Sequence, residues 1–358
     1  MTRPEKQGPV VTRDNPKCCC QPTVRHKQRS ATKIKSTDSG IHDMLRLITA
    51  SCLCACVYTE IGLAQSCIQA TIKDEGVLFT QAGKPLLFYQ RQTKSQAGKH
   101  PRANYIHPLY DLDGNVLTED FPADHPHHRG IFWAWHQLWV GDQKMGDGWA
   151  CQGFAWDVTQ LNVEPQTDGS MLLKACVHWK SSPAAKPDET SSALVEERTT
   201  IRITAAPHQP RTLDFTIRLR ALQENTRIGG SENDKGYGGF STRIRLPDGV
   251  RFVSPTSDVT PQRTAVEAGP ALDILGRFGA QDKSSGLAIL CHPSNPGFPQ
   301  PWLLRSKRSM QNVAYPGRHA VVLPTDGDLT LRYRLVIHRG SAASADLQRW
   351  QQDYAGCN

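Results

Sequence analysis

The sequence predicts an all-β protein, a large antiparallel two-sheet sandwich with a short C-terminal helix. Two segments, Leu213–Leu219 and Leu329–Ile337, alternate apolar and polar residues over their length. Such alternation places one row of side chains in a core and the other in solvent or a polar cleft. Apolar residues at helical spacing occur between Ser344, a candidate N-cap, and Tyr354. Many strands and little helix over about 290 residues favour two stacked antiparallel sheets.

Further strands and their turns follow from local signals. Val77–Thr80 and Leu86–Tyr89 flank Ala82-Gly83 and indicate a hairpin. Met171–Trp179 and Ala193–Thr204 read as two more strands. Tight turns are predicted at Asp-Gly pairs, because glycine tolerates the positive φ that they need. These pairs are Asp113-Gly114, Asp168-Gly169, Asp248-Gly249 and Asp326-Gly327.

The N-terminal region predicts export. Residues 1–43 hold nine Lys/Arg and four Asp/Glu, so we expect a disordered leader or an over-extension upstream of a true start at Met44. Residues 44–64 combine a basic start, a short apolar run and the small residues Gly62 and Ala64, the order found in a signal peptide. The alternative is a disordered basic tail with a short buried helix. Leu53–Cys56 resembles a lipobox, so a lipid anchor at Cys56 is a variant of the export hypothesis.

Residues 65–358 are then expected to form one β-sandwich domain, periplasmic or secreted. Beyond residue 43 the chain has 33 Lys/Arg against 30 Asp/Glu, without a basic stripe interleaved with aromatics, which argues against nucleic-acid binding. No stretch after residue 65 approaches a membrane-spanning length of apolar residues.

Residues 102–149 concentrate the unusual chemistry, including five of the thirteen histidines. On an extended chain His125 and His127 would point the same way and His128 the opposite way. Two imidazoles on one side, with His136 or Asp124, suit a divalent metal. The same imidazoles suit acid–base catalysis near neutral pH. The structural alternative is that these histidines cap a corner by bonding backbone carbonyls.

Two further sets of residues complete the hypothesis. Arg129 supplies a planar fork for a carboxylate or an oxyanion, and the polar segment Glu232–Phe240 supplies support. The predicted catalytic residues are His125, His127, His128, Arg129, Glu232 and Asp234. The predicted substrate-binding residues are Arg102, Tyr105, His107, Trp133, Trp135, His136, Lys235, Tyr237 and Arg243. The predicted metal set is His125, His127 and His136.

Four segments resemble the PmoA-like family of bacterial proteins, often labelled methane oxygenase PmoA. They are Tyr105–Tyr110, Val116–Asp120, Asp124–Gly130 and Lys235–Gly239, and the resemblance extends over residues 75–345. This family is similar to carbohydrate-active β-sandwich proteins, so the resemblance implies a supersandwich of the galactose-mutarotase-like type, export and a carbohydrate ligand. Oxygenase chemistry is not expected, because the body lacks apolar spans and cleavage after Ala64 would leave Gln65 first.

The sequence therefore favours an exported carbohydrate-active enzyme, a glycoside hydrolase or lyase, with a histidine-rich acid–base or metal site. One alternative is a sugar epimerase of mutarotase type, which also needs an acid and a base across the ring. The other is a non-catalytic glycan-binding protein that depends on tryptophan rings rather than histidines.

Overall fold

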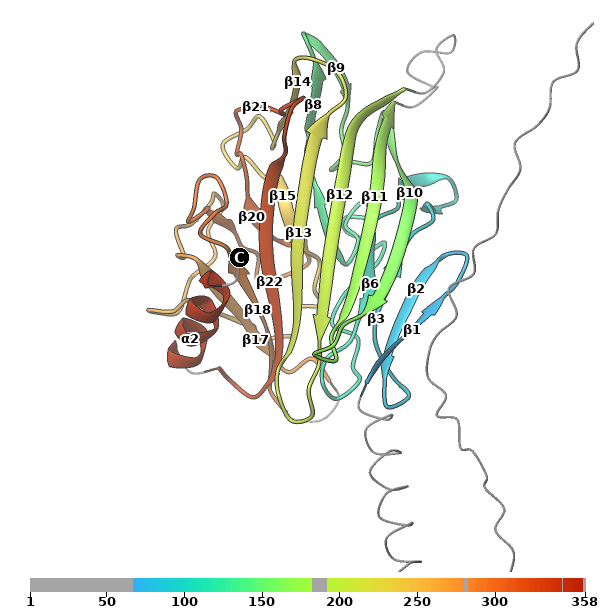
Figure 1. Cartoon of the computed structure of the whole chain (residues 1–358). Helices are drawn as coiled ribbons and strands as arrows, with labels where there is room; N and C mark the ends of the chain where they lie inside the picture. The colour runs from blue at the N-terminus through green and yellow to red at the C-terminus, as the bar shows by residue number, and fades with distance from the viewer. Residues whose placement is uncertain (1–66, 182–191, 280–282, 343, 357–358) are drawn as a thin grey trace, which may run out of the picture. The chain divides into compact units, whose positions relative to one another are not determined.

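The computed structural model describes residues 67–181, 192–279, 283–342 and 344–356. Within these residues the chain forms two eight-stranded antiparallel sheets, a four-stranded sheet, a two-stranded ribbon and one C-terminal helix (Figure 1). The two large sheets share one apolar core, so the predicted two-sheet sandwich is confirmed. The leader 1–43 and the signal 44–64 lie outside the described residues.

The first large sheet has the strand order β1-β2-β3-β6-β7-β15-β20-β19. Its strands are β1 Ile68–Ile72, β2 Gly76–Gln81, β3 Lys84–Gln90, β6 Tyr105–Leu109, β7 Ile131–Ala134, β15 Gly239–Thr242, β19 Trp302–Leu303 and β20 Gln311–Ala314.

The second large sheet has the order β10-β11-β12-β13-β22-β18-β17-β16, and its long strands run side by side in Figure 1. Its strands are β10 Phe154–Pro165, β11 Met171–Ser181, β12 Ala193–Thr204, β13 Arg211–Ala221, β16 Arg251–Val253, β17 Ala271–Gly276, β18 Ser285–Cys291 and β22 Leu329–Arg339. The smaller elements are β4 Lys94–Gln96, β5 Lys99–Arg102, β8 Gln137–Val140, β9 Gln143–Gly146, β14 Thr226–Gly229, β21 Val321–Val322 and α2 Ser344–Ala355.

Alternation along the strands fills the core as predicted. In β13 the inward side chains Leu213, Phe215, Ile217 and Leu219 are all fully buried. Their neighbours point outward and are half-buried, which is the period-two pattern of a sheet with one covered face. The predicted turns are also confirmed, since the glycines of the four Asp-Gly pairs have φ between 71° and 92°.

The helix α2 covers part of the outer face of the second sheet. Leu347 and Tyr354 pack on Ala288 and Leu290 of β18, while the intervening residues of β18 face the main core. This strand is therefore buried on both faces, which explains its continuous apolar sequence. No helix in the described part of the chain is long and apolar enough to cross a bilayer.

A buried carboxylate joins the two sheets. Glu197 of β12 accepts hydrogen bonds from Trp179 Nε1 of the same sheet at 2.9 Å and from Trp133 Nε1 of β7 at 2.9 Å. Asn104 Nδ2 and Thr199 Oγ1 each donate to it at 2.6 Å. Burial raises the pKa of Glu197, although these four donors favour its ionised form. Its partners come from both sheets, so Glu197 fixes their relative position.

Candidate active site

The candidate site lies on the face of the first sheet that points away from the main core. In β7, Ile131 and Trp133 point into the core, whereas Phe132 and Ala134 point to the opposite face. There they form a separate apolar cluster with Trp149, Tyr105 and Met310. Strand alternation thus gives this sheet a second, aromatic surface on which loops from distant parts of the chain meet.

The first of these loops carries the histidine motif, residues 121–128. Its two ends are joined by the backbone bond from Gly130 N–H to Glu119 O at 2.8 Å. Arg243 N–H donates to Gly130 O at 2.6 Å, which fastens the loop to the end of β15. A side chain at position 130 would place its Cβ 2.0 Å from Ile106 O, so only glycine allows this close approach.

The loop consists of two successive turns rather than extended chain. His125 N–H donates to Pro122 O at 3.1 Å, and His128 N–H donates to His125 O at 2.9 Å. The prediction that His128 points away from the other two is therefore wrong. The His125 and His128 rings stack with centroids 4.8 Å apart, and His127 meets His128 edge-on at 4.6 Å. The turns thus gather all three imidazoles.

His127 and His128 are held in the neutral form. Burial lowers the pKa of His127 to about 4, and the nearby His125 and Arg102 lower it further in the same direction. Burial also strongly lowers the pKa of His128, and His127 and His125 add to this effect. Both rings therefore carry a free lone pair near neutral pH, as a general base requires.

Three aromatic rings form a second wall. Trp149 stacks on His136 with centroids 5.4 Å apart and on Tyr237 with centroids 5.5 Å apart. Trp149 also meets His128 edge-on at 5.8 Å, which connects this wall to the histidine loop. His136 and Tyr237, both predicted as substrate-binding residues, are brought together with the histidine motif as expected.

A third wall is basic. It consists of Lys235 and the segment Arg305–Met310, which precedes β20. The three walls enclose a cavity of about 470 Å³. Its lining contains four histidines, Trp149, Tyr237 and four Lys/Arg side chains, and no carboxylate among the described residues. This volume suits a small-molecule ligand.

Two histidines of the cavity are oriented by carboxylates behind them. His136 Nδ1 lies 2.9 Å from Asp147 Oδ2, and His125 Nδ1 lies 2.8 Å from Asp124 Oδ2. His136 Nε2 is buried and has no hydrogen-bond partner in the described part of the chain. Burial raises the pKa of Asp147, but the bonds from His136 and the Ala150 backbone outweigh it and leave the pKa lowered. An ionised Asp147 favours a proton on Nδ1 of His136 and a lone pair on Nε2.

Arg243 is the anchor beneath the histidine loop. Its side chain is 2% exposed, and it donates from NH2 to Asp124 Oδ1 at 2.8 Å and from Nε to Glu119 Oε2 at 2.7 Å. Its NH1 also lies 3.4 Å from His128 Nδ1. Burial raises the pKa of Asp124, but the bonds from Arg243 and His125 dominate and hold it at about 2. Arg243 therefore positions the loop and does not reach the cavity, which corrects its prediction as a substrate-binding residue.

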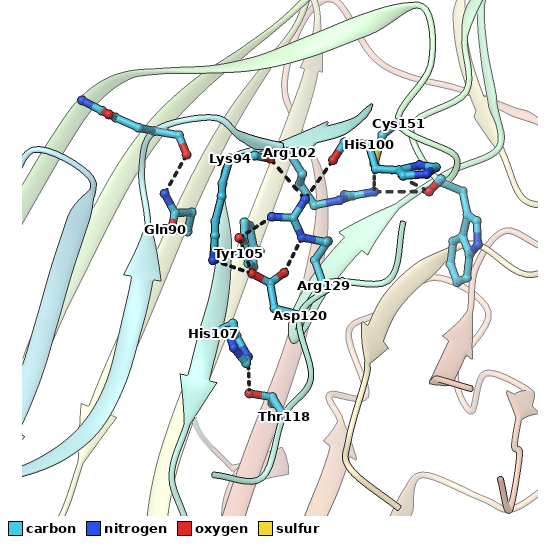
Figure 2. A network of polar contacts seen from close by, with 12 residues as sticks. Gln90, Lys94, His100, Arg102, Tyr105, His107, Thr118, Asp120, Arg129 and Cys151 are labelled. Atoms are coloured by element: carbon cyan, nitrogen blue, oxygen red, sulfur yellow. Dashed lines mark hydrogen bonds and ion pairs between the residues drawn. The ribbon is translucent and has the colours of Figure 1, made fainter. Parts of the chain in front are cut away.

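Arg129 is likewise structural. Figure 2 shows its guanidinium enclosed by Asp120, Tyr105 and the backbone of the β4–β5 ribbon. NH1 donates to His100 O at 2.9 Å, NH2 donates to Tyr105 Oη at 2.5 Å, and Lys94 Nζ donates to Asp120 at 2.8 Å. The predicted catalytic role of Arg129 and the predicted substrate contact of Tyr105 are therefore wrong, because both side chains are buried in this network.

Three other predicted contacts are also buried away from the cavity. Arg102 donates from NH2 to Gly148 O at 2.6 Å, so it supports the loop that carries Trp149. Trp133 lies in the core against Glu197, and Trp135 donates from Nε1 to Tyr315 O at 2.8 Å. The prediction that Trp133 and Trp135 form a sugar platform is wrong, because these rings face the interior.

The two predicted carboxylates do not reach the cavity. Glu232 is 66% exposed and its nearest ion-pair partner is Lys144 at 3.9 Å. Asp234 is 47% exposed and pairs with Arg263. The prediction that Glu232 and Asp234 support catalysis is therefore wrong, because neither carboxylate lines the cavity. Only Lys235 and Tyr237 of this segment line the cavity.

His107 lines a different cavity of about 510 Å³ with Glu119, Asp120 and Arg245. Its Nδ1 lies 2.9 Å from Thr118 Oγ1, and burial lowers its pKa to about 4. Both carboxylates of this cavity already pair with arginines, Glu119 with Arg243 and Asp120 with Arg129. The chemistry therefore favours the cavity beside the histidine motif.

The predicted metal set is not preassembled. Among the described residues, the one group of metal-ligating atoms within 4.8 Å of one another is Cys176, His178 and Glu196, on the outer face of the second sheet. Glu196 in that group also accepts from Arg220 NH2 at 2.8 Å. His125, His127 and His136 line one cavity without forming such a group.

Sequence reasoning missed two parts of the site. Asp147 was not singled out, although it stands between two glycines beside Trp149. The Arg305–Met310 part of the basic wall was also missed, because the segment from Ser309 to Asn312 reads as a turn. The run Arg305-Ser-Lys-Arg308 was the available signal.

Comparisons with known proteins place these features in a family. A family model described as "Family of unknown function (DUF6807)" matches residues 76–351. No curated protein matches the chain. Among solved structures, the chain is similar to the "Heparinase III-BT4657 gene product", with a TM-score of 0.31 and 8% sequence identity. The match covers 79% of this chain and 36% of that one, so the chain spans about a third of that protein.

Proposed function

The chain belongs to the family of unknown function DUF6807, and we propose that it is an exported carbohydrate-active enzyme, a lyase or a glycoside hydrolase, whose active site is the cavity beside the histidine motif. One observation carries this proposal. Two carboxylate-oriented histidines, His125 and His136, line the same cavity as a stack of Trp149 and Tyr237. An aromatic face for a sugar ring thus stands next to acid–base groups.

The histidines supply the proton transfer. Because Asp147 favours the tautomer with the proton on Nδ1, Nε2 of His136 can accept a proton from a bound substrate. The positive charge that then forms is stabilised by the same carboxylate. Asp124 gives His125, which lines the same cavity, a matching partner. We assign proton abstraction to His136 and a second acid–base role to His125 or His127.

The aromatic rings supply binding. Trp149 is almost fully buried by its neighbours, so its orientation is fixed before a ligand arrives. Tyr237 is half-buried and packs on this fixed indole, so its ring offers an apolar face that matches the C–H face of a pyranose, with little loss of side-chain entropy on binding.

The proposed export rests on the sequence of residues 44–64 and on the resemblance of Asp124–Gly130 to the PmoA-like family. A lipid anchor at Cys56 is the variant of this proposal. Mass spectrometry of the protein from its native cell envelope tests both. A mature chain that begins at Gln65 supports cleavage, and one that begins at a lipidated Cys56 supports the anchor.

The proposed activity is tested by replacing His136 with glutamine. Purified protein is incubated with a panel of plant, algal and animal glycans, and new reducing ends are counted. We expect His136→Gln to lose about 10²- to 10⁴-fold in turnover with an unchanged melting temperature. The matched control is His178→Gln on the outer face of the second sheet, which should keep full activity.

Three outcomes contradict the proposal. Full activity of His136→Gln removes the assigned base. A product that is only an epimer, without new reducing ends, favours the mutarotase-type alternative. Glycan binding without turnover that survives His136→Gln but is lost in Tyr237→Ala indicates a non-catalytic binding protein.

A further inference from the structure

The basic wall of the cavity has cations without partners. Lys307 and Arg308 line the cavity, and neither forms an ion pair or side-chain hydrogen bond in the described part of the chain. Lys235 stands on the same cavity with its Nζ 5.7 Å from the centre of the Tyr237 ring. Elsewhere on the protein exposed arginines form ion pairs, as Arg251 of β16 does with Asp258 at 2.8 Å.

The segment that carries these cations is fixed. Arg305 NH1 donates to Gln262 O at 2.8 Å, and its NH2 donates to Arg263 O at 2.9 Å. Arg308 has a φ of 47°, a left-handed conformation that costs free energy for a side chain of its type. Non-glycine residues in this conformation are frequent at ligand sites, where the surrounding structure maintains them.

The cavity lacks acidic groups that could neutralise this wall. Asp124 is occupied by Arg243 and His125, and Asp147 is occupied by His136 and Ala150. A ring bound in this cavity therefore meets an excess of positive charge. Such a field concentrates anions and excludes cations.

The type of anion follows from the acid–base groups. A neutral imidazole removes a proton from carbon only when that proton is made acidic by its neighbour. A carboxylate next to the carbon does this once cations neutralise its charge, whereas a sulfate ester on a hydroxyl group leaves the ring C–H bonds almost unchanged. A carboxylated sugar is thus the anion that uses both the basic wall and the histidines.

We infer that this cavity binds a uronic acid unit of an acidic glycan and cleaves the chain by β-elimination. This inference rests on the proposed function. His136 Nε2 takes the proton from the carbon next to the carboxylate, and that electron pair forms a carbon–carbon double bond. The bond from the adjacent carbon to the glycosidic oxygen breaks, and the leaving oxygen takes up the proton from the imidazolium. Atoms and electrons balance without water or a cofactor.

The test uses matched substrates. Polyuronates with different sugars (galacturonan, mannuronan and glucuronan) are each compared with their carboxyl-reduced form, which has the same linkage but no charge. We expect cleavage of at least one polyuronate, an unsaturated product detected by ultraviolet absorbance, and no cleavage of its reduced form. Rising salt should raise KM for the polyuronate, because it screens the exposed cations.

The double variant Lys307→Gln/Arg308→Gln tests whether the positive charge of the basic wall binds the substrate. We expect KM for the polyuronate to rise about tenfold, because two partly exposed charge contacts are lost. The matched control is Lys73→Gln/Lys84→Gln near the β1 edge of the first sheet, which removes the same charge and should leave KM unchanged. Equal effects of the two double variants overturn the assignment of the basic wall.

The outcomes separate this inference from the proposed function. New reducing ends without an unsaturated product, or cleavage of the reduced form, overturn the elimination but leave a carbohydrate-active enzyme. Absence of any cleavage that depends on His136 overturns both.

Discussion

Replacing Arg243 with methionine tests how the histidine loop is held. The change keeps most of the apolar stem and removes a guanidinium that is 2% exposed. Three hydrogen bonds to carboxylates are lost, at 2.7 Å to Glu119 and at 2.8 and 3.1 Å to Asp124. The loop 121–128 then lacks its side-chain connection to the end of β15 and keeps only the backbone bonds of residue 243.

The structure sets the size of the effect. Breaking a buried pair by removing one partner costs about 3–5 kcal/mol of unfolding free energy. Glu119 and Asp124 are 32% and 26% exposed, so water can partly solvate them once Arg243 is gone. We therefore expect a loss near the lower end, about 3 kcal/mol. Arg251→Met is the control, because Arg251 makes a comparable pair with Asp258 while both are more than half exposed. Its cost should be at most about 1 kcal/mol.

The pH dependence gives a second measure of the same contact. Asp124 has a folded pKa of about 2 against an ordinary value of 3.8. A lowered folded pKa gives stability that is present above 3.8 and is lost as the pH falls towards 2. Part of the difference between wild type and Arg243→Met should therefore disappear over that range. Urea unfolding at several pH values measures it. Equal losses in Arg243→Met and Arg251→Met, or a difference independent of pH, would refute the reasoning.

Three further predictions follow from the site and the core. Asp147→Asn should keep the fold but lower turnover about 10²- to 10⁴-fold, because the amide no longer favours the basic tautomer of His136; turnover equal to wild type would exclude this role. Glu197→Leu should cost at least about 3 kcal/mol in urea unfolding, because several buried N–H donors lose their acceptor, and a loss below about 1 kcal/mol would contradict it. Because the unfolded chain protonates His127 near 6.5 and the folded chain only near 4, unfolding free energy should fall as the pH drops between these values. His127→Gln should remove about 2 kcal/mol of that fall, and an unchanged slope would show that His127 is not held neutral.

The sheets could be predicted because their pattern is local. The alternation in Leu213–Leu219 and the Asp-Gly pairs at the turns depend only on neighbouring residues, and both appear in the structure as expected. The two-sheet arrangement follows because strands with one apolar face need a second sheet to cover it.

The direction of single side chains in β7 could not be predicted. Its sequence from Ile131 to Ala134 is apolar throughout, because this strand is covered on both faces. Alternation then gives no sign of which residues face the core. Trp133 was therefore assigned to the site, although Trp133 points into the core and Phe132 points to the face that carries the site. Arg129 was assigned by residue type, although its partner Asp120 and the β4–β5 ribbon bury it.

The basic wall could not be predicted because it arrives through a distant pairing. β20 lies beside β15 in the first sheet, and this pairing brings Lys307 and Arg308 to a histidine motif far away in the chain. No local sequence pattern indicates that these two cations lie beside the histidine motif.

The central claim is that the cavity beside the histidine motif binds and transforms a sugar. The most direct measurement is a crystal structure of His136→Gln with a polyuronate oligosaccharide that the wild-type protein cleaves. We predict one ring against Tyr237, its carboxylate facing Lys307 and Arg308, and the glycosidic bond beside position 136. A sugar held instead in the cavity beside His107, with the histidine motif unoccupied, would contradict the account.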